Sequence, residues 1–459
     1  MTNYARKLKA VHLDRPLFFV GFVFTGLLLV GQVFAQDDLP APISPSAGPV
    51  ISGQSSTPAT PPNSTPTPNS PPAPLRMQPL NSVLNQSNAN QAAQAQPANG
   101  SFFTPRASAS TAAVSQRAFS PSMIGDGFAP VPFHVTFHEG NSTGKSGIYT
   151  TVPGAGGTVG TSKIVENASP IPRDRVYFNY SDFNGVPLTV NGVNVNRYTP
   201  GFEKTFFNGM SSIEVRTPFA STLSNNLYAF DTNNGGSTQF GDLTIYLKQL
   251  FYKSETFAAS AGLGFELPTA SNTNVFYGTG NQLFSVKNQA VHLLPFLGSV
   301  YSPNEQIFVQ QFLQFDFDAN GNSVQTNSLH LPPTTVGRLN DMSYLYYSIG
   351  AGYWLYNNPG TDRFLTRIAP IVEMHYNKSL TSTDLVSAPP QFIGAQGINQ
   401  DLLNGTIGVT AMFKQNSTLT LGYVTPLSSI DHRQFNSEFR LMFNWFFGGS
   451  VNRFSRVQF

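Results

Sequence analysis

Oxygen-bearing side chains recur at alternate positions in the stretch Asp316 to Gly321 (DFDANG). Carboxylate and amide oxygens at this spacing, followed by a glycine at a sharp turn, match the opening of a calcium-binding loop. The twelfth position of such a loop needs a bidentate glutamate, but this chain has Asn327 there. We keep Asp316, Asp318 and Asn320 as a calcium candidate. The alternative is an acidic strand end that runs into an Asn-Gly turn.

Two other patterns fall short of known catalytic or phosphate-binding motifs. Gly140 to Ser146 (GNSTGKS) has one residue too few between its glycines for a phosphate-binding loop, and no strand and helix frame it. His134 and His138 share one side of a predicted strand, but at roughly 13 Å apart they are too distant to bind one metal. Gly140–Gly144 (GNSTG) has the letters of Gly-x-Ser-x-Gly but lacks the strand and helix that frame a nucleophile elbow, and His-Glu-x-x-His is absent from the chain. We therefore expect no enzymatic activity and no cofactor.

Composition narrows the class of protein. Of the 459 residues, 11% are charged and 13% are aromatic, and the net charge is +2. Typical soluble domains are about a quarter charged, so the polarity of this chain comes mainly from amides and hydroxyls. A net charge near zero offers no field that would attract nucleic acid, and no nucleic-acid partner is expected. The chain has no cysteine, which excludes disulfides and thiolate chemistry.

The most informative structural pattern is the C-terminal run Phe435 to Phe447 (FNSEFRLMFNWFF). Residues two apart share one face of a β-strand. One face therefore carries Phe439, Leu441, Phe443, Trp445 and Phe447, and the other carries Glu438, Arg440, Met442 and Asn444. An apolar face opposite a polar face, repeated over many strands, predicts a closed barrel with lipid outside and a polar lumen inside. A water-soluble β-sandwich is the alternative.

Similar alternation recurs along the chain and predicts further strands. These are Phe133–Glu139, Val176–Phe183, Phe207–Phe219, the hairpin Phe240–Leu267, and the pairs Val291–Tyr301 with Glu305–Phe317, Tyr344–Tyr356 with Phe364–Tyr376, and Leu403–Lys414 with Thr418–Thr425. Three long polar segments separate the pairs and are predicted to be loops: Pro268–Gln289, Asp318–Asp341 and Lys378–Asp401. Short turns at one end and long loops at the other are typical of transmembrane barrels.

The number of strands follows from parity. Counting back from the last strand gives eleven strands from Val176 onward, whereas bacterial single-chain barrels have an even number. Phe133–Glu139 is the candidate for the missing strand. We therefore predict an all-β fold, a transmembrane antiparallel up-and-down β-barrel of about 12 strands, with 10 or 14 as alternatives. The segment Ser450–Phe459 is an alternative closing strand.

Residues 1–123 do not show the barrel pattern. A basic lead precedes the apolar run Leu17–Val30, and Val33-Phe34-Ala35 offers a cleavage site, which predicts a signal peptide over residues 1–35. An uncleaved membrane anchor is the alternative. Residues 36–123 are rich in Pro, Ser, Ala, Asn and Gln and are predicted to form a disordered linker. A docking role for its proline-rich part is the alternative, and the barrel is expected over residues 124–459.

The chain resembles Gram-negative outer-membrane β-barrel proteins of the porin-like kind. The resemblance rests on the export signal, the hairpins, and the terminal Phe459, which looks like the aromatic residue that the barrel-assembly machinery reads. The stretches Arg173–Tyr180 (RDRVYFNY) and Gly201–Phe219 (GFEKTFFNGMSSIEVRTPF) are similar to a group of outer-membrane barrels that supplies no catalytic residues to carry over. The last nine residues, VNRFSRVQF, alternate poorly and depart from the family pattern. The resemblance implies an outer-membrane location, lipid contact and the assembly machinery as a partner.

Charged residues on the polar faces of the predicted strands are the candidate lumen lining. They are Glu214, Arg216, Asp242, Lys248, Glu266, Asp316, Arg367, Glu373, Lys414, Glu438 and Arg440. Because the two signs nearly balance, a water-filled lumen would be weakly charge-selective. The alternative is that these residues pair with one another and plug the barrel.

The predicted function is a narrow porin-like channel or transporter for small solutes in the outer membrane. One alternative is a structural or adhesive surface anchor without conductance. Another is an outer-membrane lipid-active enzyme. The solute and the oligomeric state stay open.

Overall fold

A computed structural model describes part of the chain. The described residues are 120–138, 147–153, 158–189, 191–229, 235–276, 280–327, 333–358, 363–382, 384–388, 391–394, 400–414, 416–429 and 433–448. The predicted signal peptide and residues 36–119 of the predicted linker lie outside them. Within the described ranges, no helix has the length and apolar character needed to cross a membrane.

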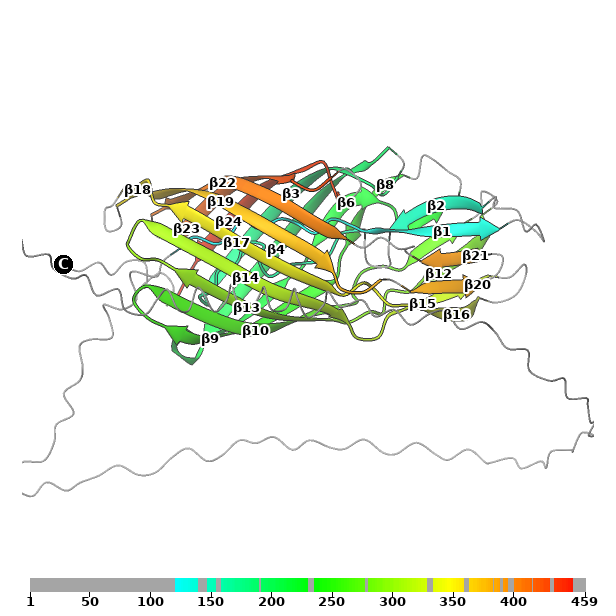
Figure 1. Cartoon of the computed structure of the whole chain (residues 1–459), viewed down its shortest axis with the longest axis horizontal. Helices are drawn as coiled ribbons and strands as arrows, with labels where there is room; N and C mark the ends of the chain where they lie inside the picture. The colour runs from blue at the N-terminus through cyan, green and yellow to red at the C-terminus, as the bar shows by residue number, and fades with distance from the viewer. Residues whose placement is uncertain are drawn as a thin grey trace, which may run out of the picture. The chain divides into compact units, whose positions relative to one another are not determined.

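The central element is a closed antiparallel barrel of 12 strands, which confirms the predicted fold class. Its strands pair in the order β3-β24-β23-β22-β19-β17-β14-β13-β10-β9-β5-β4, and β4 pairs with β3 to close the ring (Figure 1). The strands are β3 (Arg175–Val186), β4 (Val193–Phe206), β5 (Ser211–Arg216), β9 (Leu243–Lys253), β10 (Phe257–Leu267), β13 (His292–Tyr301), β14 (Ile307–Asp318), β17 (Tyr344–Tyr353), β19 (Leu365–Ser379), β22 (Asp401–Phe413), β23 (Ser417–Pro426) and β24 (Ser437–Phe446).

Alternating side chains separate the outside of the barrel from its lumen. On β24, Trp445 is 48% exposed, whereas the neighbouring Asn444 is 1% exposed and Arg440 is fully buried. On the paired strands β19 and β22, Val372 and Ile407 face outward at 59% and 61% exposure. The apolar faces therefore point away from the lumen. They do not meet across two stacked sheets, which excludes the β-sandwich alternative.

The two ends of the barrel differ in the length of their connections. Links of a few residues join β9 to β10, β13 to β14, and β22 to β23, whereas long links join β10 to β13, β14 to β17, and β19 to β22. We call these the short-turn end and the long-link end. The links predicted to be loops contain strands of their own, so that prediction was wrong. Figure 1 shows several of these strands beyond the long-link end.

The long links and the N-terminal part of the chain build two small sheets. One has the order β2-β1-β21-β20 and the other β16-β15-β12-β11-β7. Their strands are β1 (Pro132–His138), β2 (Gly147–Pro153), β7 (Asn226–Tyr228), β11 (Thr273–Phe276), β12 (Gln282–Val286), β15 (Asn322–Thr326), β16 (Thr334–Leu339), β20 (Leu385–Ala388) and β21 (Gln391–Gly394). Val275, Phe284, Val324, Val386 and Ile393 form a shared apolar core between them. Each link contributes only two to four buried residues to this core, so no single link shows it in sequence.

The twelfth barrel strand is β4, and not the predicted Phe133–Glu139. The latter segment forms β1, which pairs with β2 and β21 in a small sheet. The β4 sequence was missed because Pro200 and Gly201 lie at its centre, and these residues usually end a strand. In the barrel, Pro200 and Gly201 lie opposite Phe178 and Tyr177 of β3, within a register that is continuous from Arg175 to Phe183.

The predicted strand Phe207–Phe219 is divided in the structure. Phe207–Gly209 form the 3-10 turn η1, Ser211–Arg216 form β5, and β6 (Phe219–Leu223) turns back to pair with β4 and with β8 (Gly236–Phe240). In the connection between β17 and β19, the short strand β18 (Tyr356–Asn357) pairs with the first residues of β19. The ring closes between β24 and β3 without Ser450–Phe459, the alternative closing strand, which lies outside the described residues.

The exposed apolar band predicts a large cost for a charge at its centre. Ile407 lies midway along β22, and arginine at the midplane of a membrane barrel costs about 2–4 kcal/mol. For the barrel folded in lipid vesicles, we expect Ile407→Arg to lower the free energy of unfolding by about this amount in a urea titration. Leu385 on β20 is similarly exposed at 53% but lies in a small sheet, so Leu385→Arg should change stability by less than about 0.5 kcal/mol. Equal, small effects of both variants would argue against lipid around β22.

Candidate functional site

Two stretches of the N-terminal chain run through the barrel lumen. We call residues 120–131 and 158–174 the luminal segment. The first stretch begins beside Arg173 and Arg175, at the start of β3, and reaches Tyr344, at the start of β17. It therefore runs from the short-turn end to the long-link end, continues into β1 and β2, and returns through the second stretch to β3 (Figure 1).

The luminal segment is buried almost throughout. Met123, Ile124, Asp126, Ala129 and Lys163 are each 0% exposed. It contains no strand, and it reverses through tight turns in which Glu166 N–H donates to Lys163 and Ala168 N–H donates to Val165. We call the strands around the lumen the wall. Among the described residues, one backbone–backbone hydrogen bond joins the luminal segment to the wall, and in it the Phe447 N–H donates to the Asp174 carbonyl. Side chains of the wall bond to several of the segment's other backbone groups, and the Met123 N–H donates to the Ala168 carbonyl between the two stretches.

Two glutamates of the wall hold the first stretch. The Glu373 carboxylate accepts the backbone N–H groups of Ile124 at 2.8 Å and Gly125 at 2.7 Å. The Glu438 carboxylate accepts the N–H of Gly127 at 2.8 Å. A Cβ at Gly127 would lie 2.3 Å from the Phe183 ring, so this close approach of backbone to wall requires glycine.

Asp126 and Lys163 join the two stretches at the centre of a polar cluster. They form an ion pair in which both side chains are at most 1% exposed. The other Asp126 oxygen accepts hydrogen bonds from Asn377 at 2.9 Å and Asn404 at 2.8 Å. The His375 ring lies 3.5 Å from Asp126 and 3.3 Å from Glu373. A charge buried this deeply requires such partners, because an unpaired ion in a low dielectric costs several kcal/mol.

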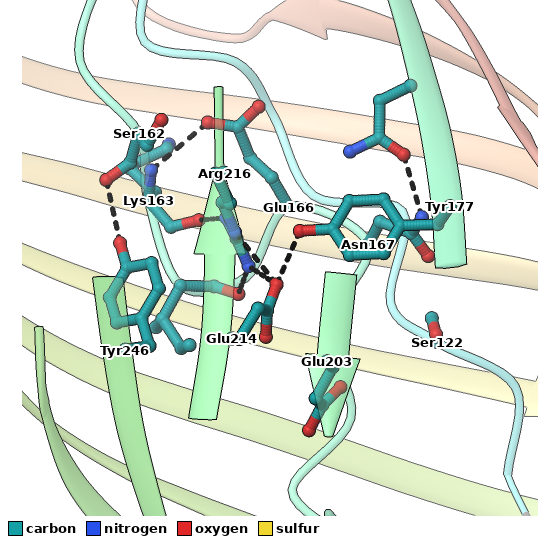
Figure 2. Close-up of polar contacts among 12 residues, drawn as sticks. Ser122, Ser162, Lys163, Glu166, Asn167, Tyr177, Glu203, Glu214, Arg216 and Tyr246 are labelled. Carbon is teal, nitrogen blue, oxygen red and sulfur yellow. Dashed lines mark hydrogen bonds and ion pairs between the residues drawn. The ribbon is translucent and has the colours of Figure 1, made fainter. Parts of the chain in front are cut away.

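Glu166 and Arg216 connect the second stretch to the opposite part of the wall. One Glu166 oxygen accepts from Arg197 at 2.5 Å and from Arg440 at 3.0 Å. Arg216 donates to the Lys163 carbonyl at 2.7 Å and to Glu214 at 2.8 Å. Figure 2 shows Tyr177 and Tyr246 on either side of Arg216, with their hydroxyls directed at Glu214 and the Ser162 carbonyl.

Basic side chains gather on one side of the lumen. Five neighbouring strands of the described barrel each contribute one that is at most 2% exposed: Arg440, Arg175, Arg197, Arg216 and Lys248, from β24, β3, β4, β5 and β9. Glu203, Glu214 and Glu438 lie among them. The remaining strands contribute the buried acids Glu266, Asp316 and Glu373. The charge is therefore separated across the lumen as well as balanced in total.

Most of the predicted lumen-lining residues lie inside the barrel. Glu214, Arg216, Lys248, Glu266, Asp316, Glu373, Glu438 and Arg440 are each at most 4% exposed. Arg367 is 9% exposed and lies over the Trp354 ring at 5.6 Å. Asp242 is half-buried before β9 and accepts from Ala270 and Asn288.

Lys414 does not lie in the lumen. It is exposed in the turn after β22, with a positive φ of 47°. The alternation of β22 ends at Phe413, one residue before Lys414. The prediction that Lys414 faces the lumen was wrong because it extended the strand pattern into the turn.

The oxygens of the calcium candidate already accept hydrogen bonds. Asp316 contacts the His292 ring at 2.7 Å inside the barrel. Asp318 accepts the backbone N–H groups of Asn320, Gly321 and Asp341 at the strand end, and Asn320 accepts that of Val291. This is the arrangement of an acidic strand end before an Asn-Gly turn. Within the described ranges, no group of three or more His, Asp or Glu side chains is placed to hold a metal.

Asp174 fixes the return of the luminal segment to the wall. It accepts hydrogen bonds at 2.8 Å from both the backbone and the hydroxyl of Thr205, and at 3.0 Å from Lys204. Burial would raise the pKa of Asp174, but these donors hold it below its ordinary value. The carboxylate therefore stays ionised at the junction with β3.

The sequence prediction missed the luminal segment and its charged residues. Asp126, Lys163 and Glu166 lie in irregular chain, so no strand period marks them. Glu203 and Arg197 lie on β4, which was itself missed. The one available signal was the Gly125-Asp126-Gly127 turn between apolar pairs, at the end of the polar linker.

These features define the protein as a transmembrane-type β-barrel with an apolar exterior and an ion-paired interior. No protein-family model matches the chain, and no curated protein matches it. Solved structures with a similar fold include the NanC porin (5% identity, 60% of this chain and 100% of that one, TM-score 0.36) and an outer membrane channel from Pseudomonas putida F1 (11% identity, 61% and 97%, TM-score 0.40). The beta domain of a Bordetella autotransporter, Brka, is also similar (9% identity, 60% and 100%, TM-score 0.39). Likenesses this remote carry no argument about function.

Removing Glu373 should loosen the luminal segment without opening the ring. Glu373→Ala leaves two buried N–H groups without an acceptor, at about 1–3 kcal/mol each. We expect faster amide hydrogen exchange at Ile124 and Gly125 and unchanged exchange in β9 and β10. Lys414→Ala, in an exposed turn, is the matched control and should alter neither. Unchanged protection of Ile124 and Gly125 in Glu373→Ala would show that Glu373 does not hold the segment.

Proposed function

We propose that the protein is an outer-membrane transport barrel for small solutes, which the luminal segment closes and which opens when that segment moves. The observation that carries the proposal is that side chains, and almost no backbone pairing, bind the luminal segment to the wall. The twelve-stranded ring is complete without it. The segment can therefore leave without breaking a strand pair.

The polar wall also supports a pathway. Many strand residues that face the segment are Arg, Glu, Gln, Asn, Ser and Thr, and these can be hydrated once the segment has moved. Apolar side chains such as Leu294, Phe296 and Phe312 also pack against it. A wall that only had to pack against a permanent core could be apolar, because a buried ion pair contributes little net stability compared with apolar packing. The outward apolar band supports lipid as the surrounding solvent.

A structural anchor is the second candidate. It is favoured by the completeness of the closure, since residues 122–129 of the luminal segment are all buried. In that case the barrel holds the N-terminal chain at the short-turn end and displays the small sheets at the other end. Measuring conductance with the segment free and with it tethered separates the two functions.

A disulfide between the segment and the wall should abolish opening. A Cβ at Gly422 would lie 2.6 Å from Ile124 Cγ2, so Ile124→Cys with Gly422→Cys brings two sulfurs within bonding reach. The natural chain has no cysteine to compete. In planar bilayers we expect rare conductance steps from the natural protein and from the reduced variant, and none from the oxidised variant.

The matched control places a disulfide within the wall. Thr410 and Thr420 are cross-strand partners on β22 and β23, with their hydroxyls 2.8 Å apart. The pair Thr410→Cys with Thr420→Cys should conduct equally when oxidised and reduced, because it does not hold the luminal segment. If the natural protein and the reduced variants are all silent, the transport proposal fails and the anchor is favoured.

Orientation is tested by labelling intact cells. Short turns of outer-membrane barrels face the periplasm, so the long-link end should face outward. An epitope inserted in the link between β1 and β2 should bind antibody on intact cells. The same epitope beside Lys414, at the short-turn end, should bind only after the outer membrane is permeabilised. The reverse result would invert the barrel.

A further inference from the structure

Arg197 and Arg440 lie in one row across three strands. Arg440 of β24 pairs with Ser181 of β3, and Ser181 pairs with Arg197 of β4. All three residues are at most 2% exposed and face the lumen. The small Ser181 side chain leaves space between the two guanidinium groups. Two cations in one buried row repel each other, and a nearby anion is needed to offset that repulsion.

Glu166 of the luminal segment supplies that anion. One of its carboxylate oxygens accepts from both guanidinium groups, at 2.5 Å and 3.0 Å. Its other oxygen accepts the Lys163 N–H at 3.1 Å within the segment. The Nε atoms of Arg197 and Arg440 are buried and have no hydrogen-bond partner. The pair therefore retains donors beyond those that Glu166 occupies.

The two arginines differ in what remains if the segment leaves. Arg440 keeps its ion pair with Glu438 of the wall at 3.0 Å. The hydrogen-bond partners of Arg197 are Glu166 and the carbonyls of Phe128 and Thr161, all from the luminal segment. Movement of the segment thus exposes one neutralised and one unneutralised guanidinium, with a net positive charge and several free donors.

We propose that Arg197 and Arg440 form a binding site for a small carboxylate solute, and that Glu166 occupies this site while the barrel is closed. A free carboxylate offers the same oxygens to the same guanidinium forks. Solute binding and closure by Glu166 therefore compete for one position, which links the chemistry of the solute to opening. This proposal names the solute class for the transport function proposed above and rests on it.

Chemical rescue tests the site without measuring transport. Glu166→Ala removes the resident carboxylate and leaves space for acetate. For full-length Glu166→Ala in detergent, we expect sodium acetate to restore, saturably, at least half of the loss in the midpoint of thermal unfolding. Sodium chloride at equal ionic strength, sodium phosphate and neutral acetamide should restore less. Acetate should not shift the natural protein, whose site is filled, nor Glu166→Ala combined with Arg197→Ala.

Other outcomes overturn the proposal. If acetate and acetamide raise the unfolding midpoint of Glu166→Ala equally, this pair is not a carboxylate site. The same conclusion follows if acetate raises the midpoint equally in Glu166→Ala and in Glu166→Ala combined with Arg197→Ala. If phosphate restores more of the unfolding midpoint of Glu166→Ala than acetate does, the site does not prefer carboxylates. Glu166→Gln, which conserves the side-chain volume, serves as the folding control. If Glu166→Gln folds but Glu166→Ala does not fold even in acetate, or if neither variant folds in any of these salts, the pair does not accept a free carboxylate.

Transport by reconstituted vesicles gives a separate readout. We expect Arg197→Ala to bring the ratio of benzoate uptake to benzamide uptake to about one, and this ratio is the readout because loss of the Arg197–Glu166 pair also changes total uptake. Absence of any uptake would contradict the transport function, whereas acetate rescue would still decide whether Arg197 and Arg440 bind a carboxylate. Failure of the transport function and failure of the carboxylate site are therefore distinguishable.

Discussion

Pairing of buried charge is the constraint on which the interior depends. Arg175, Arg197, Arg216 and Arg440 are at most 1% exposed, and an unpaired ion at this depth would cost several kcal/mol. The wall does not supply all of the partners. Arg197 donates to Glu166 of the segment, and Glu373 and Glu438 accept N–H groups of the first luminal stretch. The polar groups of the wall and of the segment therefore satisfy one another, although the ring of strands is closed without the segment. Either water or a solute must replace these polar contacts whenever the segment leaves.

The irregular backbone of the luminal segment is possible for the same reason. Buried N–H and C=O groups are almost always paired, and in most buried chains secondary structure performs that pairing. In this segment, carboxylates and amides of the wall accept the N–H groups of Ile124, Gly125, Gly127 and Ile164. Arg216, Lys248 and Gln310 donate to its carbonyls. A path held in this way is specific in position and can also be exchanged for hydration.

The outer surface follows a different rule from the lumen. Its exposed apolar residues, such as the cross-strand partners Val372 and Ile407, form a contiguous surface that favours an apolar solvent, because so many large apolar side chains together are not stable in water. Beyond the long-link end, the links instead bury their own apolar residues in a core shared by two small sheets. One chain thus combines an exposed apolar band on the barrel, a charged interior, and a cap that consists of the two small sheets.

Most strands of the wall could be predicted from local side-chain order. Period-two alternation in the run Phe435–Phe447 and in the hairpins depends only on local side-chain order, so the face of Arg440 and the approximate strand number could be predicted from it. Tertiary structure decided which side chains meet. β4 was hidden by Pro200 and Gly201, whose effect neighbouring strands override. The Arg197, Glu166 and Arg440 contact joins residues up to 274 positions apart, and neither the path of the luminal segment nor the core of the cap leaves a periodic trace, because both arise from burial against distant chain.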